Sequence, residues 1–74
     1  MSRDRLLSMA RAVRGEPLRR WPGWSTGELV AVALVLNDHQ ALKALAFTVC
    51  EAFDRVSGDF TVAELRAVER VLNQ

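Results

Sequence analysis

The run from Leu29 to Leu36 constrains the fold most strongly, because every residue in it is apolar. A helix on the surface of a protein keeps polar residues on one side. This run has none, so the rest of the chain has to cover it from nearly every direction. Periodicity cannot distinguish a helix from a strand in so short a run. Its valines favour a strand, whereas its alanines and leucines favour a helix.

The residues just before the run predict that it is a helix. Ser25 followed by Glu28 matches a capping box, in which the hydroxyl accepts from the third helical amide and the glutamate reaches back to the cap. Trp24 and Leu29 flank this box and can form the apolar contact that often accompanies it. We therefore expect a buried central helix over about residues 26–36.

Four further segments have apolar residues at helical spacing, over residues 3–14, 38–46, 49–56 and 62–72. The expected inward faces are Leu6, Met9, Ala10, Val13, Ala41, Leu42, Leu45, Val49, Ala52, Phe53, Val56, Val62, Leu65, Val68 and Leu72. Three of these segments also begin with a possible capping box. The boxes are Asn37 with Gln40, Thr48 with Glu51, and Thr61 with Glu64. Because caps and periodicity agree independently, they predict an all-α fold: a compact orthogonal bundle of about five short helices, with no sheet.

The charges are divided unevenly along what should be a single domain of 74 residues. Residues 1–20 carry six arginines and two carboxylates, whereas residues 21–74 carry four basic and seven acidic side chains. This predicts a basic helix and a loop rich in Trp, Pro and Gly (1–24) docked on an acidic helical body (25–74). The arm either neutralises its own body or is reserved for an external acidic partner, and the sequence leaves both readings open.

No combination of residues predicts catalysis or a bound metal or cofactor. Cys50 is expected to be a small buried or boundary residue, and His39 a surface or boundary residue, with nothing to place the two together. Residues 51–65 resemble an EF-hand loop only in outline. Phe53 and Arg55 fall at two positions where calcium needs oxygen ligands. We therefore expect a protein that is not an enzyme.

A soluble, cytoplasmic protein is the expected setting. A single cysteine excludes an internal disulfide, and the N-terminus alternates arginine with apolar residues instead of forming an apolar signal segment. The central run is well short of the ~18 apolar residues that a bilayer-spanning helix needs. We expect no membrane association.

The candidate binding residues lie in the arm and its loop: Arg11, Arg14, Arg19, Arg20 and Trp21. Arginine and tryptophan are over-represented at protein-binding hot spots, so these residues suit a protein partner with an acidic surface. The same side chains could stack on bases and pair with phosphates, which keeps nucleic acid as an alternative partner. Both tryptophans could instead cover the core. The surplus of apolar residues could form a homodimer interface.

The residues Trp24, Gly27 and Glu28, followed by the run from Val30 to Asn37, resemble a pattern in small uncharacterised accessory proteins of bacterial phages and conjugative elements. That resemblance implies a short chain that acts by binding, with no catalytic residues. Such chains are often inhibitors of host enzymes or defence systems, anti-CRISPR proteins among them. The expected function is a protein-binding inhibitor or adaptor that occludes a host protein surface.

Overall fold

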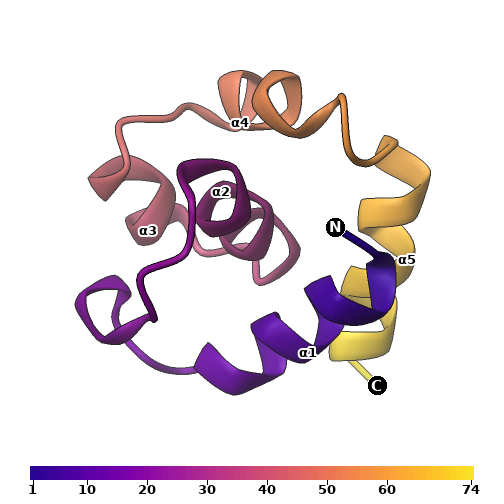
Figure 1. Ribbon diagram of the computed structural model, residues 1–74, viewed down its shortest axis with the longest axis horizontal. Helices are drawn as coiled ribbons and strands as arrows, with labels where there is room; N and C mark the ends of the chain where they lie inside the picture. The colour runs from indigo at the N-terminus through magenta and orange to yellow at the C-terminus, as the bar shows by residue number, and fades with distance from the viewer.

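Helices form the whole framework of the molecule. The computed structural model describes residues 1–74 and contains five α-helices, one 3-10 helix and no strand (Figure 1). In chain order they are α1 (Arg3–Val13), η1 (Leu18–Arg20), α2 (Thr26–Val35), α3 (His39–Ala44), α4 (Val49–Val56) and α5 (Val62–Leu72). The predicted all-α fold is confirmed. None of these helices has the length and apolarity that crossing a bilayer requires.

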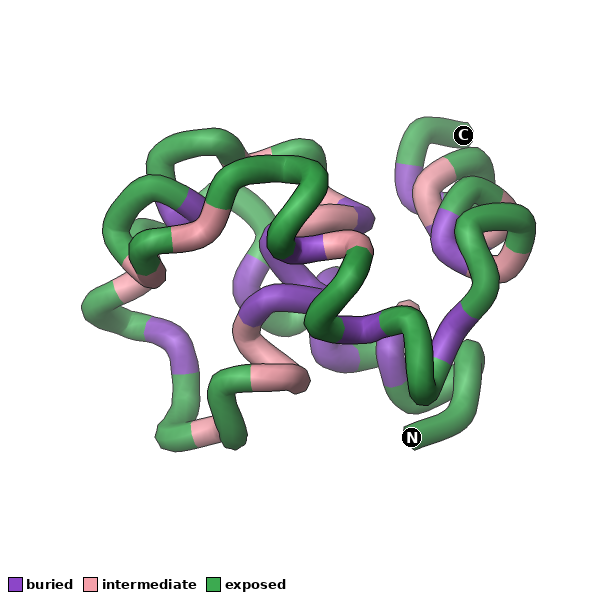
Figure 2. The backbone as a smooth tube through the Cα atoms, turned by 90° about the horizontal axis from the view of Figure 1, so that it is seen from above, coloured by how far each residue is buried: buried purple, intermediate pink, exposed green.

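The central helix of the molecule is α2, as its apolar run predicts. Its residues 30–33 are fully buried, and Val35 is nearly so. Helices α1, α3, α4 and α5 all pack against it, and Figure 1 shows α2 surrounded by them. Figure 2 shows buried and exposed segments alternating along the helices, as expected for helices with one face in the core. Trp24 and Leu29, the expected flanking pair, are half-buried and pack against the core.

Three of the four predicted capping boxes are present with both of their hydrogen bonds, at the starts of α2, α4 and α5. The fourth is wrong. Asp38, not Asn37, caps α3, and its carboxylate accepts from the amide of Ala41 at 3.0 Å. Asn37 has a φ of 54° and closes α2 instead. A residue in the left-handed conformation ends a helix. Because Asn37 has this role for α2, the next residue, Asp38, becomes the cap of α3.

Acid should lower the stability of the folded protein, because it protonates the glutamates of the three capping boxes. Backbone hydrogen bonds from Ser25, Thr48 and Thr61 are the largest cause that holds the pKa values of Glu28, Glu51 and Glu64 below their ordinary 4.5. A group with a lower pKa in the folded state stabilises it above the unfolded pKa and loses that effect as pH falls through the folded value. We therefore expect the melting temperature to fall as the pH drops below about 4.5.

The matched variant replaces all three glutamates by glutamine. Glutamine can still close a capping box but does not titrate. The melting temperature of this variant, followed by circular dichroism at a series of pH values, should depend less on pH than that of the parent. An equal acid-induced loss in both proteins would assign the effect to other carboxylates.

Helices α2 and α3 end in the same way, with a residue in the left-handed region. Ala46 has a φ of 64°, and the amide of Phe47 reaches back to the carbonyl of Leu42 at 2.9 Å. The same bond joins Asp38 to Ala33 at the end of α2. This is the Schellman motif, which usually places glycine at the left-handed position. It explains why α3 stops at Ala44, two residues before the predicted end.

Ala46→Gly is expected to raise the free energy of unfolding by about 1 kcal/mol, because glycine adopts the left-handed conformation without the cost that a Cβ imposes. Ala44→Gly is the matched control, since Ala44 is exposed and is the last residue of the same helix, two positions before the left-handed residue. That change should lower the free energy of unfolding by roughly 0.5–1 kcal/mol. Urea titrations of the two variants measure both values. If both variants had a lower free energy of unfolding than the parent, the backbone at position 46 would not be strained.

Two predicted core positions are wrong. Val49 and Val62 are 39% and 53% exposed. Each is the first residue of its helix, directly after the cap, where the chain has not yet turned inward. The next residues on those faces, Ala52 and Leu65, make the core contacts. Leu45 and Phe53 are only partly buried and pack against the edge of the core.

Candidate binding surface

The loop that carries the candidate residues begins with a sharp turn after α1. Arg14 and Gly15 have the φ values of a type II turn, −57° and 82°, and the amide of Glu16 donates to the carbonyl of Val13 at 2.9 Å. The third position of this turn requires a positive φ, which explains the glycine. The turn sends the loop back toward the body and into η1.

Trp21 is not part of an exposed surface. Its side chain belongs to the core with 7% exposure, and its Nε1–H donates to the carbonyl of Glu16 at 3.0 Å. The ring of Trp24 lies 6.4 Å away, tilted by 53°. The turn after α1 returns the chain far enough for the indole to complete the core. Burial favours the alternative that Trp21 covers the core, and a partner could reach the indole only by opening the loop.

Arg14 is bound within the molecule. Its guanidinium donates to the carbonyl of Leu72 and, at 3.5 Å, to the Oδ1 of Asn73. These contacts join the end of α1 to the end of α5. A cation placed on the last carbonyls of a helix satisfies unpaired acceptors and interacts favourably with the helix dipole. Arg14 therefore holds the arm to the body, which the docking prediction did not anticipate.

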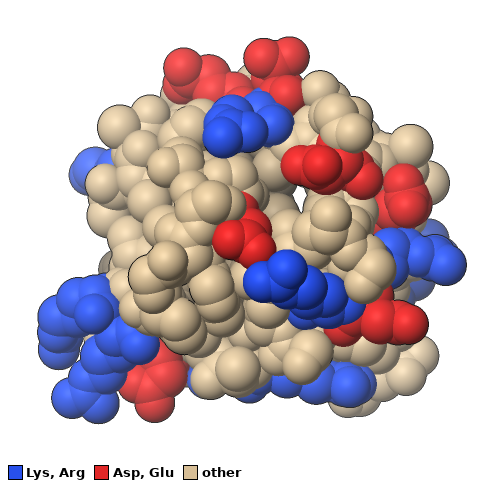
Figure 3. Space-filling model, in the orientation of Figure 1, with Lys and Arg blue, Asp and Glu red and all other residues tan.

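The remaining three candidates are exposed. Arg11 lies in the last turn of α1, and Arg19 and Arg20 lie on η1. The side chain of Arg20 is 67% exposed and 3.6 Å from Glu16, so this ion pair is loose. Figure 3 shows basic side chains gathered over η1 at the lower left and along the lower edge. We call Arg11, Arg19 and Arg20 the basic edge.

The sequence left two roles open for the arm, docking on its own body and binding an external acidic partner, and these roles apply to different arginines. Arg5 forms an ion pair with Glu28 on α2 at 3.1 Å, and Arg14 binds α5, so these two serve the docking of the arm on the body. The arginines of the basic edge have no comparable role. Among them, only Arg20 has an ion pair, and that pair is local to the loop.

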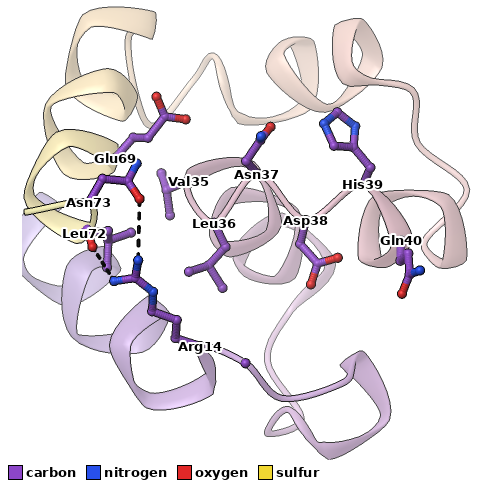
Figure 4. A pocket seen from close by; sticks show the side chains of 11 residues that line it. Arg14, Val35, Leu36, Asn37, Asp38, His39, Gln40, Glu69, Leu72 and Asn73 are labelled. Atoms are coloured by element: carbon purple, nitrogen blue, oxygen red, sulfur yellow. Dashed lines mark hydrogen bonds between the residues drawn. The ribbon is translucent and has the colours of Figure 1, made fainter.

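An open groove of about 670 Å³ lies beside the basic edge, where the ends of α1, α2 and α5 meet (Figure 4). Val35, Leu36 and Leu72 contribute its apolar surface. Figure 4 shows the side chain of Arg14 pointing toward Leu72 and Asn73 at the end of α5, with Asn37 and Asp38 on the other side of the groove. The polar and charged residues around the groove are Arg14, Asn37, Asp38, His39, Gln40, Glu69 and Asn73.

A smaller hollow of about 300 Å³ separates η1 from α3. Pro17, Leu18 and Arg19 line it on one side, and residues 41 and 44 line it on the other. Asp38 and Gln40 line both this hollow and the larger groove, so the two concavities adjoin around the start of α3. The basic edge is therefore next to a concave surface that could receive a partner.

The two side chains considered for catalysis are both on the surface. His39 is exposed at the first position of α3, which agrees with its expected surface placement. Cys50 is also exposed, so its expected buried or boundary position is wrong. The second position of α4 faces outward, as does Val49 beside it. No group of three or more His, Cys, Asp or Glu side chains is arranged to hold a metal ion.

Comparison of the chain with protein-family models, with curated proteins and with solved structures found no match.

Proposed function

We propose that this protein is a non-enzymatic protein-binding module that occludes an acidic surface of a partner protein. The observation that carries the proposal is the basic edge. Arg11, Arg19 and Arg20 project into solvent, whereas Arg5 and Arg14 of the same arm are bound by the body. Arginines that do not serve the fold are available to a carboxylate-bearing partner, with which they can form bidentate hydrogen bonds.

The anchoring of the loop strengthens this proposal. Trp21 lies directly after η1 and holds the loop to the core, so Arg19 and Arg20 project from a fixed backbone. A preorganised surface loses less conformational entropy on binding than a flexible loop does. Charge complementarity would speed the encounter and select the partner. In the proposed mechanism, affinity comes from arginine and from the adjoining hollows, with no direct contribution from the indole.

The role as an inhibitor or adaptor rests on the resemblance to short accessory chains of phages and conjugative elements and on the small size of the domain. A domain of this size can block a surface by covering it. Nucleic acid remains the alternative partner, but burial of Trp21 removes the aromatic ring that would stack on bases. The three arginines of the basic edge then have to bind nucleic acid through phosphate contacts, without a stacking ring from Trp21.

The test compares two variants with the same change in net charge. Arg19→Glu with Arg20→Glu reverses the basic edge, and Arg66→Glu with Arg70→Glu reverses two exposed arginines on α5. Binding is measured by fluorescence anisotropy to poly-L-glutamate, to duplex DNA and to single-stranded DNA. Partners captured from host lysate are quantified with both variants and with the parent.

We expect the first variant to weaken binding to poly-L-glutamate and to a captured protein by more than about tenfold, and the second to change it little. Equal losses in both variants would show that only net charge matters, which contradicts the proposal. Tighter binding to DNA than to the acidic polypeptide, with a linear fall of log affinity with log salt, would establish the nucleic-acid alternative instead.

A further inference from the structure

We infer that the groove at the meeting point of α1, α2 and α5 binds a basic side chain, arginine or lysine, from a segment of a partner protein. The first observation is the open end of α2. The carbonyl oxygens of Val35 and Leu36 accept no hydrogen bond within the molecule, and both residues line the groove. The C-terminal end of a helix carries a partial negative charge, and α2 has no basic residue in its last turn.

Two carboxylates add to this negative potential. Asp38 and Glu69 both line the groove and are both half-buried. The carboxylate of Asp38 accepts one hydrogen bond, from the amide of Ala41, whereas the carboxylate of Glu69 has no hydrogen bond or ion pair. Glu69 also lies in the last turn of α5, where the helix dipole disfavours a negative charge. Arg14 and Arg70 already place positive charge at the end of α5, whereas the end of α2 has none. A cation in the groove would be attracted by the two carboxylates and by the open end of α2.

The protein already uses a guanidinium for this purpose in the same groove. Arg14 caps the end of α5 through the carbonyl of Leu72 and the side-chain amide of Asn73 (Figure 4). Leu36 and Asn37 lie at the end of α2 and also line the groove. Arg14 donates to Leu72 and Asn73 and forms no hydrogen bond with Leu36 or Asn37. A guanidinium has five donors in a planar fork and suits several acceptors at once.

The shape of the groove fits a basic side chain with its neighbouring backbone. The half-buried side chain of Leu36 can cover part of the methylene stem, while the charged end reaches the polar rim. Val35 and Leu72 are almost fully buried and form the floor beneath it. The volume of about 670 Å³ exceeds that of one side chain, which leaves room for adjoining peptide groups. The rim amides of Asn37, Gln40 and Asn73 can pair with those groups. This inference does not rest on the basic edge.

The experiment is an NMR titration of the full chain, labelled with ¹⁵N, using an acetylated and amidated Gly-Gly-Arg-Gly-Gly peptide. A peptide with citrulline in place of arginine keeps the shape and lacks the charge. We expect shift changes at Asn37, Asp38, Glu69 and Asn73, and clearly weaker binding of the citrulline peptide. Equal binding of both peptides, or shift changes confined to other surfaces, would overturn the inference.

Two variants test the role of charge. Glu69→Gln should weaken binding of the arginine peptide by roughly threefold to tenfold, while Asp59→Asn, which removes a carboxylate from an exposed turn away from the groove, should not. Loss of the charge at position 69 suits the end of α5, so the variant should stay folded, which circular dichroism checks. Unchanged binding by Glu69→Gln would contradict the inference. The Arg19→Glu, Arg20→Glu variant should bind this peptide at least as well as the parent, which separates the two proposals.

Discussion

Trp21→Ala is expected to lower the free energy of unfolding by about 3–5 kcal/mol, the range for removing a buried aromatic side chain. The indole is part of the continuous core, contacts the ring of Trp24 and donates to the carbonyl of Glu16. Small domains have a total stability of about 5–15 kcal/mol, and this chain is at the small end. The variant should therefore be largely unfolded at moderate urea concentrations where the parent is folded.

Two further substitutions separate packing from hydrogen bonding in this result. Trp21→Phe keeps an aromatic ring and loses the Nε1–H donor, so it should lose less stability than the alanine variant. Trp24→Ala removes a ring that is only half-buried and should also have a smaller effect. Urea titrations followed by circular dichroism give all three values. If Trp21→Ala lost less than about 1 kcal/mol, the loop would not be part of the core, and the basic edge would lack a fixed backbone.

Leu6→Ala is the second large effect, with an expected loss of about 2–5 kcal/mol. Leu6 is fully buried in α1, which packs against both α2 and α5. Removing its side chain would leave a cavity where the N-terminal helix meets the central one. The loss would show that the basic arm is an integral part of the domain and not an appendage.

Leu7→Ala is the matched control, because it makes the same chemical change one residue further along the same helix. Leu7 is only half-buried, beside a shallow hollow between α1 and α5. Its loss should be clearly smaller than that of Leu6→Ala, since water already contacts part of the side chain. A loss as large as that of Leu6→Ala would show that α1 is rotated from its position in this structure.

The helices could be predicted because their determinants are local. At the starts of α2, α4 and α5, a serine or threonine and a glutamate three residues later specify where each helix begins. The end of α3 was harder, since its left-handed residue is Ala46, and alanine gives no sign of that conformation. The aspartate after Asn37 could have identified the true cap, because aspartate is a favoured cap residue.

The binding surface was less predictable, because exposure depends on contacts across the whole chain. The basic arm followed from the charge pattern, but which of its arginines bind the body did not. Whether the side chain of Trp21 is buried depends on how closely the turn after α1 brings the loop to the core. The groove was not anticipated at all, since it forms where the ends of three helices meet.

The sequence by itself determined that the chain is helical, where most helices begin and which helix is central. Those properties follow from hydrogen bonds and apolar spacing within a few residues, and from a run too apolar to face water. Only the tertiary structure decided that Trp21 is buried, that Cys50 is exposed and that Arg14 binds Leu72, 58 positions further along the chain. The physical reason is that burial and distant hydrogen bonds depend on how helices pack, and local sequence does not encode that packing directly.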